Sequence, residues 1–422
     1  VGYAMNSATP KIRGRCSPNA INVVAKLDGG AQAMNDSDCS DGTFEINLSG
    51  LSVANHEVQI TADSNSSGDT ADLKIEVQNC AMAAITTAGS FPGGDGTSGD
   101  PYQITTVEEL DHVRDDMVGE YYRLMNNIDL SCKAFSALGT SASKFQANFD
   151  GNGFTIRRLS IDYPTVDNLG FIGYMGNTSS LINTGVVDTY IRGDDQTGVL
   201  VGQLYSTTAT VIDSYGSGFV QTGASTNVNT GGLVGIFRNG MGSKIYFGGA
   251  VEGAVTTGGV AAYPYGANIS NAINFGLVAP LKGTFGGVFG KSYNVGHLTK
   301  LTNYGVVHGP NTTSDTVGGI IGYSYGYGMI SECKNYGSVS GETSVGGIIG
   351  KLSTITLVDC VNKGKVYGNY YVGGVAGKLY GSSTLVRSQN HGEVDGTNGT
   401  TKDYVGGVAG RAYKTKISDS YS

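Results

Sequence analysis

The sequence predicts an all-β protein whose main part is a right-handed β-solenoid, a coil of short strands and turns. Three observations predict this fold. A glycine-rich segment recurs about every 30 residues over the C-terminal half of the chain. The 422 residues include 67 glycines and only eight prolines, which suits an array of tight turns. A helical pattern appears convincingly in one short segment only.

We divide the chain into four parts. The expected parts are an Ig-like β-sandwich module (1–82), a linker (83–100), an N-terminal cap of the solenoid (101–165) and the solenoid repeats (166–422). The module shows short strand-like runs separated by turns rich in Asp, Asn, Ser and Gly. The expected strands are Lys11–Cys16, Ile21–Leu27, Thr43–Leu48, Glu57–Ala62 and Asp72–Gln78.

Three motifs of the module, I-x-G-x-C, C-x-D-G-T-F and H-E-V-Q-I-T-A-D, resemble bacterial Ig-like modules that occur in adhesins. With this resemblance we pair Cys16 with Cys39, and Cys80 with Cys132. A calcium site and an ordinary acidic hairpin loop both fit the polar residues near the end of the module, and the loop is the favoured interpretation. Those residues are Asp63, Asn65 and Asp69.

The cap contains the predicted helix, in which Thr105 and Glu108 have the spacing of a capping box. The apolar face of this helix consists of Val107, Leu110, Val113 and Met117. Strand-like segments follow at 121–130 and 145–161. We expect a unit of this kind at the end of a solenoid, because it covers the apolar core and the unpaired strand edge there.

The repeat itself is G-G-h-h-G, where h is hydrophobic. Clear copies begin at Gly231, Gly286, Gly318, Gly346, Gly373 and Gly406, and looser copies end at Gly173, Gly202 and Ala262. Successive copies are 27 to 33 residues apart. A second motif, N-x-G-x-V, follows about 12 residues later in five copies. We therefore expect two short strands per repeat, with glycine where turns need a positive φ or a close backbone approach.

This repeat resembles the GLUG motif of bacterial surface proteins, as in the G-G-L-V-G that begins at Gly231. The run G-G-D-G-T-x-x-D-P-Y-x-I-x-T-x-x-E-L, then N-I-D-L and F-D-G-N-G-F-T-I, is similar to the leader of such arrays. The resemblance covers about three quarters of the chain. It implies a surface protein, and it leaves open whether that protein is an adhesin, a fibre tip or an accessory region of a protease.

Residues one repeat apart are neighbours in a solenoid, so the sequence forms columns. Of the three positions that follow each Gly-Gly strand, the middle one is mostly apolar and is expected to point inward. The first and third positions then face outward, and they are rich in Tyr and cations. The candidate ligand-binding residues are Tyr205, Tyr263, Tyr265, Tyr293, Tyr323, Tyr325, Tyr380, Tyr413, Lys291, Lys351, Lys378 and Arg411.

Two interpretations of these columns remain open. Tyrosine rings with neighbouring cations suit sugar faces and acidic groups on a partner surface. The favoured alternative is structural, because stacked tyrosines and cation–π pairs stabilise a parallel sheet. A second aromatic column, equally ambiguous, consists of Tyr215, Phe275, Tyr304 and Tyr336.

A column of asparagines is expected to form an internal ladder of amide hydrogen bonds. Its members are Asn183, Asn274, Asn303, Asn335, Asn362 and Asn390. Two residues before this column, Cys333 and Cys360 occupy adjacent coils. Buried thiols and a disulfide are both open for this cysteine pair.

Several classes of function are disfavoured. The net charge of −8 argues against nucleic-acid binding, and no apolar run is long enough to span a membrane. The chain lacks C-x-x-C, H-E-x-x-H and G-x-S-x-G motifs. The outward acids are scattered apart from the pair Asp194-Asp195. We therefore expect no metal site, no cofactor and no catalytic residues.

The sequence thus predicts a secreted or surface-exposed bacterial adhesin or fibre tip. Its expected ligand is a glycan or surface polymer of a host or prey cell. A structural spacer without a ligand site is the alternative, and a polysaccharide-processing enzyme is the lesser one. An open solenoid end favours self-association, for example as a homotrimer.

Overall fold

The computed structural model describes residues 81–86, 88–222, 228–309, 315–396 and 404–422, together with Asp28 and the strands within residues 1–80. Cys16, Cys39, Cys80, Asn65 and Asp69 lie outside the described residues, and so do the side chains of the first eighty residues apart from Lys26 and Asp28. Cys132 is described and is disulfide-bonded. The backbone N–H of Ala83 donates to the Cys132 carbonyl (2.7 Å), so the chain just after the module lies beside this cysteine.

In the described part of the N-terminal module, short strands form two sheets. The five expected strands are present as β2 (Lys11–Arg15), β3 (Ala20–Leu27), β5 (Thr43–Asn47), β6 (Ala54–Ser64) and β7 (Leu73–Asn79). β1 (Tyr3–Ala4) and β4 (Ala33–Asp36) were not predicted, because such short strands show little alternation. One sheet has the order β1-β7-β6-β3-β4, and β2 pairs with β5 in the other. Two sheets are the arrangement expected of a β-sandwich.

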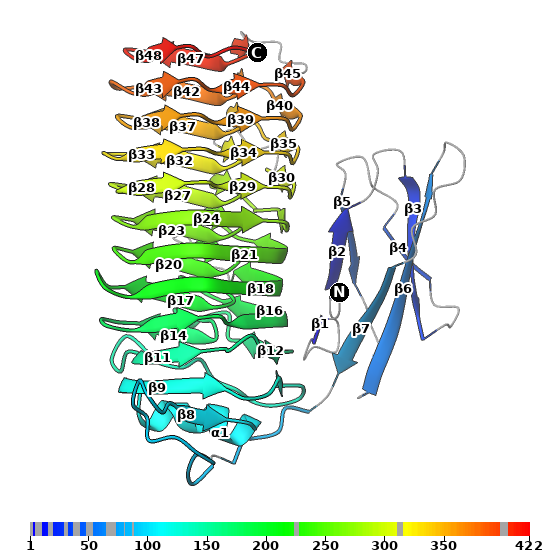
Figure 1. Cartoon of the computed structure of the whole chain (residues 1–422). Coiled ribbons are helices and arrows are strands. Elements are labelled where there is room, and N and C mark those ends of the chain that lie inside the picture. The colour runs from blue at the N-terminus through cyan, green and yellow to red at the C-terminus, as the bar shows by residue number, and fades with distance from the viewer. Residues whose placement is uncertain are drawn as a thin grey trace.

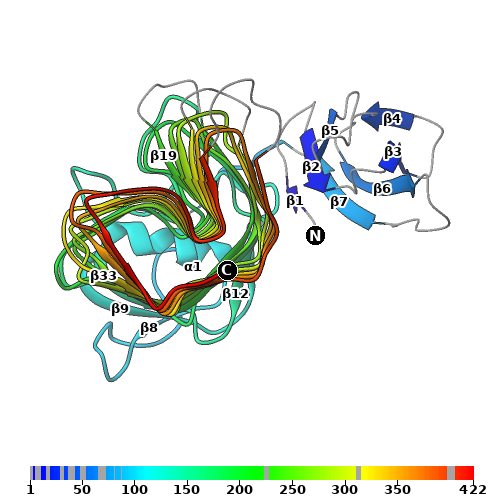
Figure 2. The same cartoon turned by 90° about the horizontal axis from the view of Figure 1, so that it is seen from above.

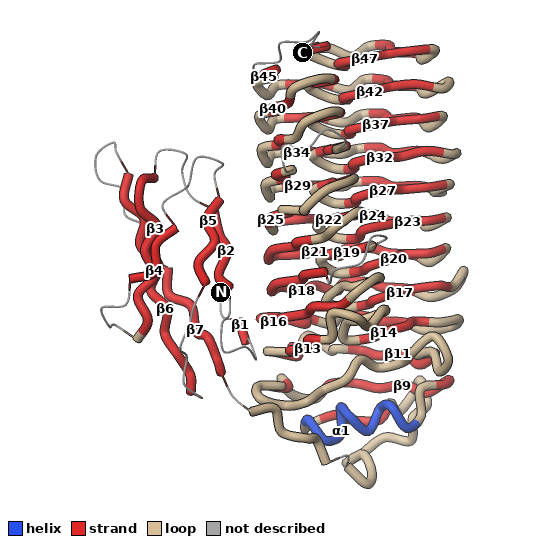
Figure 3. The backbone as a smooth tube through the Cα atoms, turned by 180° about the vertical axis from the view of Figure 1, so that it is seen from behind, coloured by secondary structure: helices blue, strands red, loops and turns tan. Residues whose placement is uncertain are grey.

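One short helix lies at the N-terminal end of the solenoid (Figures 1 and 3). This helix, α1 (Val107–His112), continues into the 3-10 turn η1 (Val113–Asp115). Leu110 and Val113 are fully buried, so the predicted apolar face does pack onto the core. The helix therefore covers apolar core at this end, as expected of a capping unit.

The capping box lies one residue later than predicted. The Thr106 hydroxyl accepts from the backbone N–H of Glu109 (3.2 Å), and the Glu109 carboxylate accepts from the N–H of Thr106 (3.1 Å). The predicted pair Thr105 and Glu108 was wrong, because the backbone is still extended at Thr106, with φ −131° and ψ 168°. The Thr105 hydroxyl donates to the same Glu109 carboxylate (2.9 Å).

Parallel stacking begins inside the segment predicted as the cap. β8 (Tyr102–Ile104) pairs with β9 (Val118–Leu124), and β9 pairs with β11 (Gln146–Asp150). β11 then pairs with β15 (Ser180–Ile182) of the next coil. Strands of 101–165 therefore belong to the same continuous sheet as the later repeats.

The repeats form an all-β solenoid, as predicted, with three parallel sheets that run along its length (Figure 1). The nine-stranded sheet consists of β14 (Ile172–Met175), β17 (Val201–Tyr205), β20 (Val234–Arg238), β23 (Ala261–Tyr265), β27 (Phe289–Tyr293), β32 (Ile321–Tyr325), β37 (Ile349–Ser353), β42 (Ala376–Tyr380) and β47 (Ala409–Tyr413). The seven-stranded sheet consists of β19 (Asn229–Gly231), β22 (Thr256–Gly258), β26 (Thr284–Gly286), β31 (Thr316–Gly318), β36 (Ser344–Gly346), β41 (Tyr371–Gly373) and β46 (Tyr404–Gly406). All other described strands of the solenoid belong to the third, 25-stranded sheet.

The expectation of two strands per repeat was wrong. A complete coil contributes β31 and β32 to the shorter sheets, and β33 (Met329–Ser331), β34 (Lys334–Asn335) and β35 (Val339–Ser340) to the long one. Glu332, whose φ is +55°, separates β33 from β34 just before the N-x-G-x-V motif. Tight turns thus divide what the sequence presents as a single strand.

Seen along the axis, each coil folds inward, so that the nine-stranded and seven-stranded sheets approach each other (Figure 2). Glycine makes this approach possible. A Cβ on Gly290 would lie 2.7 Å from the carbonyl oxygen of Thr257. A Cβ on Gly287 would lie 2.2 Å from the Gly319 oxygen and 2.4 Å from the amide carbon of Asn303. The second glycine of G-G-h-h-G therefore packs against the asparagine of N-x-G-x-V, which brings the two motifs together.

The predicted asparagine ladder is confirmed. The Asn303 side-chain amide donates to the Gly305 carbonyl (2.8 Å) and to Oδ1 of Asn335 (2.9 Å), and its own Oδ1 accepts from the Gly305 N–H (3.1 Å). The other members of the ladder are Asn274, Asn335, Asn362 and Asn390. These side chains are all buried, and the hydrogen bonds of the ladder replace those that their amides would form with water.

Asn183 was wrongly placed in this ladder. Its side chain is exposed and donates to Oδ1 of Asp150 (3.1 Å). Register pairs connect Asn274 instead with Phe247 and Gly216 of the preceding coils. The error arose because the letters N-x-G-x-V also occur at 183–187, where the register places Val186, and not Asn183, in the ladder column.

The two cysteines of the repeats are free and fully buried. The backbone N–H of Cys333 donates to Sγ of Cys360 (3.3 Å), and burial raises the pKa of the Cys333 thiol. Of the two alternatives that the sequence left open, the structure therefore has the buried thiols, and the disulfide hypothesis for this pair was wrong. Parallel neighbouring side chains at one column position meet poorly for a disulfide.

Candidate ligand-binding face of the nine-stranded sheet

The nine-stranded sheet brings the predicted columns into register. Tyr293 pairs with Tyr325, so residues 32 positions apart are direct neighbours. Lys351 pairs with Lys378, and Lys378 with Arg411. Column membership in this sheet was therefore predicted correctly from the period alone.

The predicted alternation of inward and outward side chains is also confirmed. The middle column is buried from Met175 to Leu379, and the first and third columns are mostly half-buried. Of these outward residues, Tyr205, Arg411 and Tyr413 are exposed. We refer to the outward first and third columns together as the tyrosine face.

Neighbouring tyrosines of this face contact one another along the axis. Ring centroids are 5.2 Å apart for Tyr265 and Tyr293, and 4.5 Å apart for Tyr293 and Tyr325. The hydroxyl groups of Tyr263 and Tyr325 form a hydrogen bond with an O···O distance of 2.9 Å. This bond spans two coils, so the rings connect strands that are not adjacent in the sheet.

Burial keeps several of these phenols neutral. It raises the pKa of Tyr263 far above its usual value, and the hydrogen bond with Tyr325 raises it further. Burial likewise raises the pKa of Tyr323, which shares a hydroxyl hydrogen bond with Tyr380. These groups therefore act as hydrogen-bond donors and acceptors at neutral pH, and not as anions.

Cations cover the faces of several rings. The Arg238 guanidinium carbon lies 4.5 Å from the centroid of Tyr205 and 4.7 Å from that of Tyr265. Lys291 Nζ lies 5.2 Å from the centroid of Tyr325 and 5.5 Å from that of Tyr263. Such contacts stabilise the stack, and they leave ring edges and hydroxyls, more than ring faces, available to a ligand.

Two tyrosines that complete this surface were not predicted from the sequence. Tyr371 in β41 and Tyr404 in β46 belong to the seven-stranded sheet, and their rings stack with centroids 5.3 Å apart. Lys378 Nζ lies 4.2 Å from the Tyr371 centroid, and Nη1 of Arg411 donates to the Tyr371 hydroxyl (3.2 Å). Both tyrosines stand two residues before a Gly-Gly pair, so the repeat period could have placed them in one column. Ser344 occupies the same position in the preceding coil.

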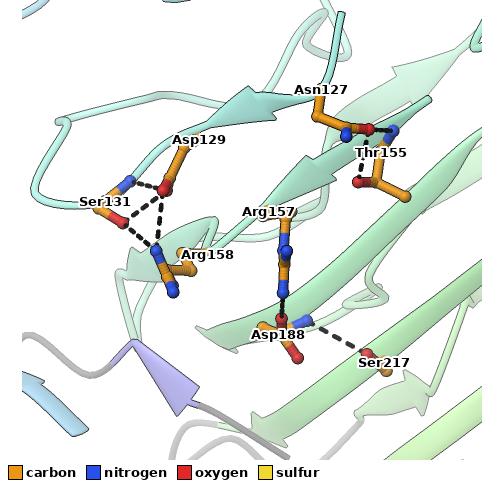
Figure 4. A network of polar contacts seen from close by, with 8 residues as sticks. All are labelled: Asn127, Asp129, Ser131, Thr155, Arg157, Arg158, Asp188 and Ser217. Atoms are coloured by element: carbon orange, nitrogen blue, oxygen red, sulfur yellow. Dashed lines mark hydrogen bonds and ion pairs between the residues drawn. The ribbon is translucent and has the colours of Figure 1, made fainter. Parts of the chain in front are cut away.

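The electrostatic environment differs between faces of the solenoid. On the 25-stranded sheet, Arg157 pairs with Asp188 (3.0 Å), and Arg158 pairs with Asp129 (2.8 Å), as Figure 4 shows. On the tyrosine face, the pKa of Lys351 is lowered by burial and by the charge of Lys378. The cations there are thus packed against rings and against one another.

The second aromatic column is real but differs in membership. Phe275 and Tyr304 stack with centroids 5.2 Å apart and an angle of 3°, and Tyr304 and Tyr336 with 4.9 Å and 7°. Lys363 lies 5.5 Å above the Tyr336 ring. Tyr215 was wrongly included. It pairs with Tyr246, and Tyr246 pairs with Ile273, so Tyr215 lies in the column of Ile273 and not in that of Phe275. A shallow hollow at the C-terminal end of this column is lined by Lys334, Tyr336, Val361, Lys363, Gln389 and His391.

The acidic pair Asp194-Asp195 has a structural role in the coil. The Asp195 carboxylate accepts from the backbone N–H groups of Gln196 (2.8 Å) and Asn229 (2.8 Å) and from the Asn229 amide (3.0 Å). Burial raises the pKa of Asp195 despite these bonds.

In the described part of the chain, no group of three or more His, Cys, Asp or Glu side chains could hold a metal ion. No described helix is long and apolar enough to cross a membrane.

No protein-family profile matches the chain. Halomucin of Haloquadratum walsbyi is 26% identical over 231 residues, which are 51% of this chain and 2% of Halomucin. A Gly-rich membrane protein of Evansella cellulosilytica is 30% identical over 131 residues, 29% of this chain and 15% of that protein. The chain thus matches only a small part of each relative. The solved catalytic domain of an α-1,3-glucanase in complex with tetrasaccharides covers 96% of this chain and 89% of that domain, at 14% identity and a TM-score of 0.23, which supports no argument.

Proposed function

We propose that this chain is a recognition segment of a secreted or cell-surface protein and that its tyrosine face binds glycans or other surface polymers. The observation that carries the proposal is the column of Lys351, Lys378 and Arg411 beside the hydroxyl groups of Tyr380 and Tyr413. Cations and phenols are the groups that recognise acidic and hydroxyl-rich polymers.

The repeat geometry supports a polymer more than a small molecule. Each coil presents a similar pair of outward positions about 4.8 Å from the next. A chain that lies along the solenoid axis meets the same chemistry several times, so weak contacts add up. The location is supported by the two relatives, whose names, Halomucin and Gly-rich membrane protein, are those of surface proteins.

A second function, a structural spacer without a ligand site, is favoured by one specific observation. Arg238 and Lys291 cover ring faces that a stacked sugar would need. In that case the tyrosines serve only to hold the coils together. Neither proposal assigns the chain a catalytic reaction. The Asp195 carboxylate, part of the one close acidic pair in the repeats, accepts hydrogen bonds from the backbone N–H groups of Gln196 and Asn229.

The test is an array of bacterial and host polysaccharides probed with the wild-type chain and two variants. We expect Tyr413→Phe to weaken binding while its melting temperature stays close to that of the wild type, because this side chain is 56% exposed. Tyr293→Ala/Tyr325→Ala is expected to lower the melting temperature in either case, because it removes stacked rings. Absence of any bound polymer, with this thermal effect present, would leave the spacer as the better function.

A further inference from the structure

Three consecutive coils place a cation at the same outward position. Lys351 in β37, Lys378 in β42 and Arg411 in β47 are register partners, so their backbones are one strand spacing apart, about 4.8 Å. Lys291 continues the column two coils earlier, with Tyr323 between it and Lys351. We call Lys351, Lys378 and Arg411 the cation strip. Like charges stacked in this way repel one another.

Several other cations of the solenoid lie beside a carboxylate of an adjacent coil. Arg387 pairs with Asp359 (2.7 Å), and Lys365 pairs with Glu393 (2.9 Å), in each case across adjacent coils. Lys244 pairs with Asp213 in the same manner (3.1 Å). No described carboxylate forms an ion pair with the cation strip. Among the described residues the strip therefore lacks ion-pair partners, although acidic side chains are in excess in this chain of net charge −8.

Hydroxyl groups flank the strip on both sides. Tyr371 lies beneath Lys378 and accepts from Arg411, and Tyr380 and Tyr413 pair with each other in the neighbouring third column. The lowered pKa of Lys351, caused first by burial and then by Lys378, is the opposite of what a bound anion would produce. The pattern is that of a row of anion-binding positions whose counter-charge comes from another molecule.

We propose that the cation strip binds an anionic polysaccharide, sulfated or carboxylated, which lies along the solenoid axis across β37, β42 and β47. This inference rests on the proposed recognition function and specifies its ligand class. A polysaccharide fits better than nucleic acid, because nucleic-acid sites need a broad basic surface and the chain as a whole is acidic. The regular spacing of the cations suits a polymer whose charges also repeat.

The experiment compares dextran sulfate with neutral dextran of the same length, using the whole chain. We expect the wild type to bind dextran sulfate, with an affinity that falls as salt is raised, and not to bind dextran. The strip variant Lys351→Gln/Lys378→Gln/Arg411→Gln is expected to lose at least about tenfold in affinity and to show a weaker salt dependence. Polygalacturonate, which is carboxylated, separates carboxylate from sulfate as the preferred group.

The matched control is Lys244→Gln/Lys365→Gln/Arg387→Gln, which removes the same charge from paired cations elsewhere. It is expected to bind within about twofold of the wild type. Equal losses of affinity in the two triple variants would overturn the proposal that the cation strip is the binding site. Binding of duplex DNA as tight as that of dextran sulfate would overturn the proposed ligand class. Binding of neutral glycans alone, unchanged in the strip variant, refutes this inference and leaves the proposed function standing. Absence of binding to every polymer refutes both.

Discussion

The ammonium nitrogen of Lys378 lies 4.2 Å from the centroid of the Tyr371 ring, although the two side chains belong to different sheets. The chain bends between them at Gly373-Gly374, where β41 ends and β42 follows. Arg411 of the next coil donates to the same phenol. These cations therefore connect the two sheets at the bend, and no described carboxylate neutralises them, so the same contacts hold in place the charges on which the proposed recognition depends.

The last glycine of G-G-h-h-G, which lies just after the bend, is expected to be intolerant of any side chain. In Gly290→Ala, the new Cβ would lie 2.7 and 2.8 Å from backbone atoms of Thr257, which cannot move independently of the sheet. We expect the free energy of unfolding to fall by about 2–4 kcal/mol, measured by chemical denaturation. The control Gly248→Ala has no atom within 4 Å of its Cβ and should change stability by less than about 1 kcal/mol. Equal effects of the two changes would contradict this role of the last glycine.

The asparagine ladder is expected to contribute strongly to stability. Asn303→Ala removes the amide that bridges Asn274 and Asn335 and leaves buried polar atoms without partners. We expect a loss of about 2–3 kcal/mol in unfolding free energy. Asn126→Ala, at an exposed position with one long hydrogen bond of 3.5 Å, is the matched control and should cost far less. A ladder variant as stable as the control would show that the amide bonds contribute little.

Stability should decline at alkaline pH. The pKa values of Tyr263 and Tyr323 are raised in the folded chain above the ordinary value of 10.0, chiefly by burial. Their contribution is therefore fully present below about pH 10 and is lost as the pH rises further, because only the unfolded phenols ionise readily. Each contributes a slope of at most about 1.4 kcal/mol per pH unit.

Unfolding titrations between pH 9 and 12 test this expectation. Tyr263→Phe should flatten the alkaline slope, because the buried phenol is gone. Tyr327→Phe, at a side chain that is 65% exposed, should leave the slope unchanged. Identical slopes in the wild type and in Tyr263→Phe would rule out this phenol as the cause.

The two repeat cysteines should be unreactive in the folded chain. Both are fully buried, and burial raises the pKa of Cys333, so little thiolate forms at neutral pH. We expect iodoacetamide to label Cys333 and Cys360 only after unfolding, as followed by peptide mass mapping. A cysteine introduced by Lys363→Cys, on the outside of the coil, should react within minutes. Comparable labelling of all three in the native state would disagree with the buried thiols.

Much of the nine-stranded sheet could be predicted from the sequence alone. Parallel strands align each residue with its counterpart one period away, so the G-G-h-h-G spacing determined that Tyr293 meets Tyr325 and that Lys378 meets Arg411. Period-two alternation then decided which column is buried. The asparagine ladder from Asn274 to Asn390 followed in the same way.

Other features depend on where the backbone turns, and the spacing of the repeat motifs does not predict these turns. Asn183 was misplaced because the letters N-x-G-x-V also occur at 183–187, where the register puts Val186 in the ladder column. Tyr215 was misplaced because it lies in the long strand β18 (Thr210–Thr222), whose register pairs it with Tyr246 of β21 (Met241–Glu252). The capping box shifted by one residue, because two adjacent threonines offer the same chemistry and only the backbone at Thr106 decides between them.

The sequence by itself determined the coil, its period and the columns, because these depend on local repetition. Only the tertiary structure decided that each coil folds inward and that Tyr371 meets Lys378 across the bend. It also decided that Arg387 has a carboxylate partner while no described carboxylate pairs with Arg411. Such pairings depend on the positions of separate strands in space, and strand positions follow from backbone turns and not from the spacing of residues along the chain.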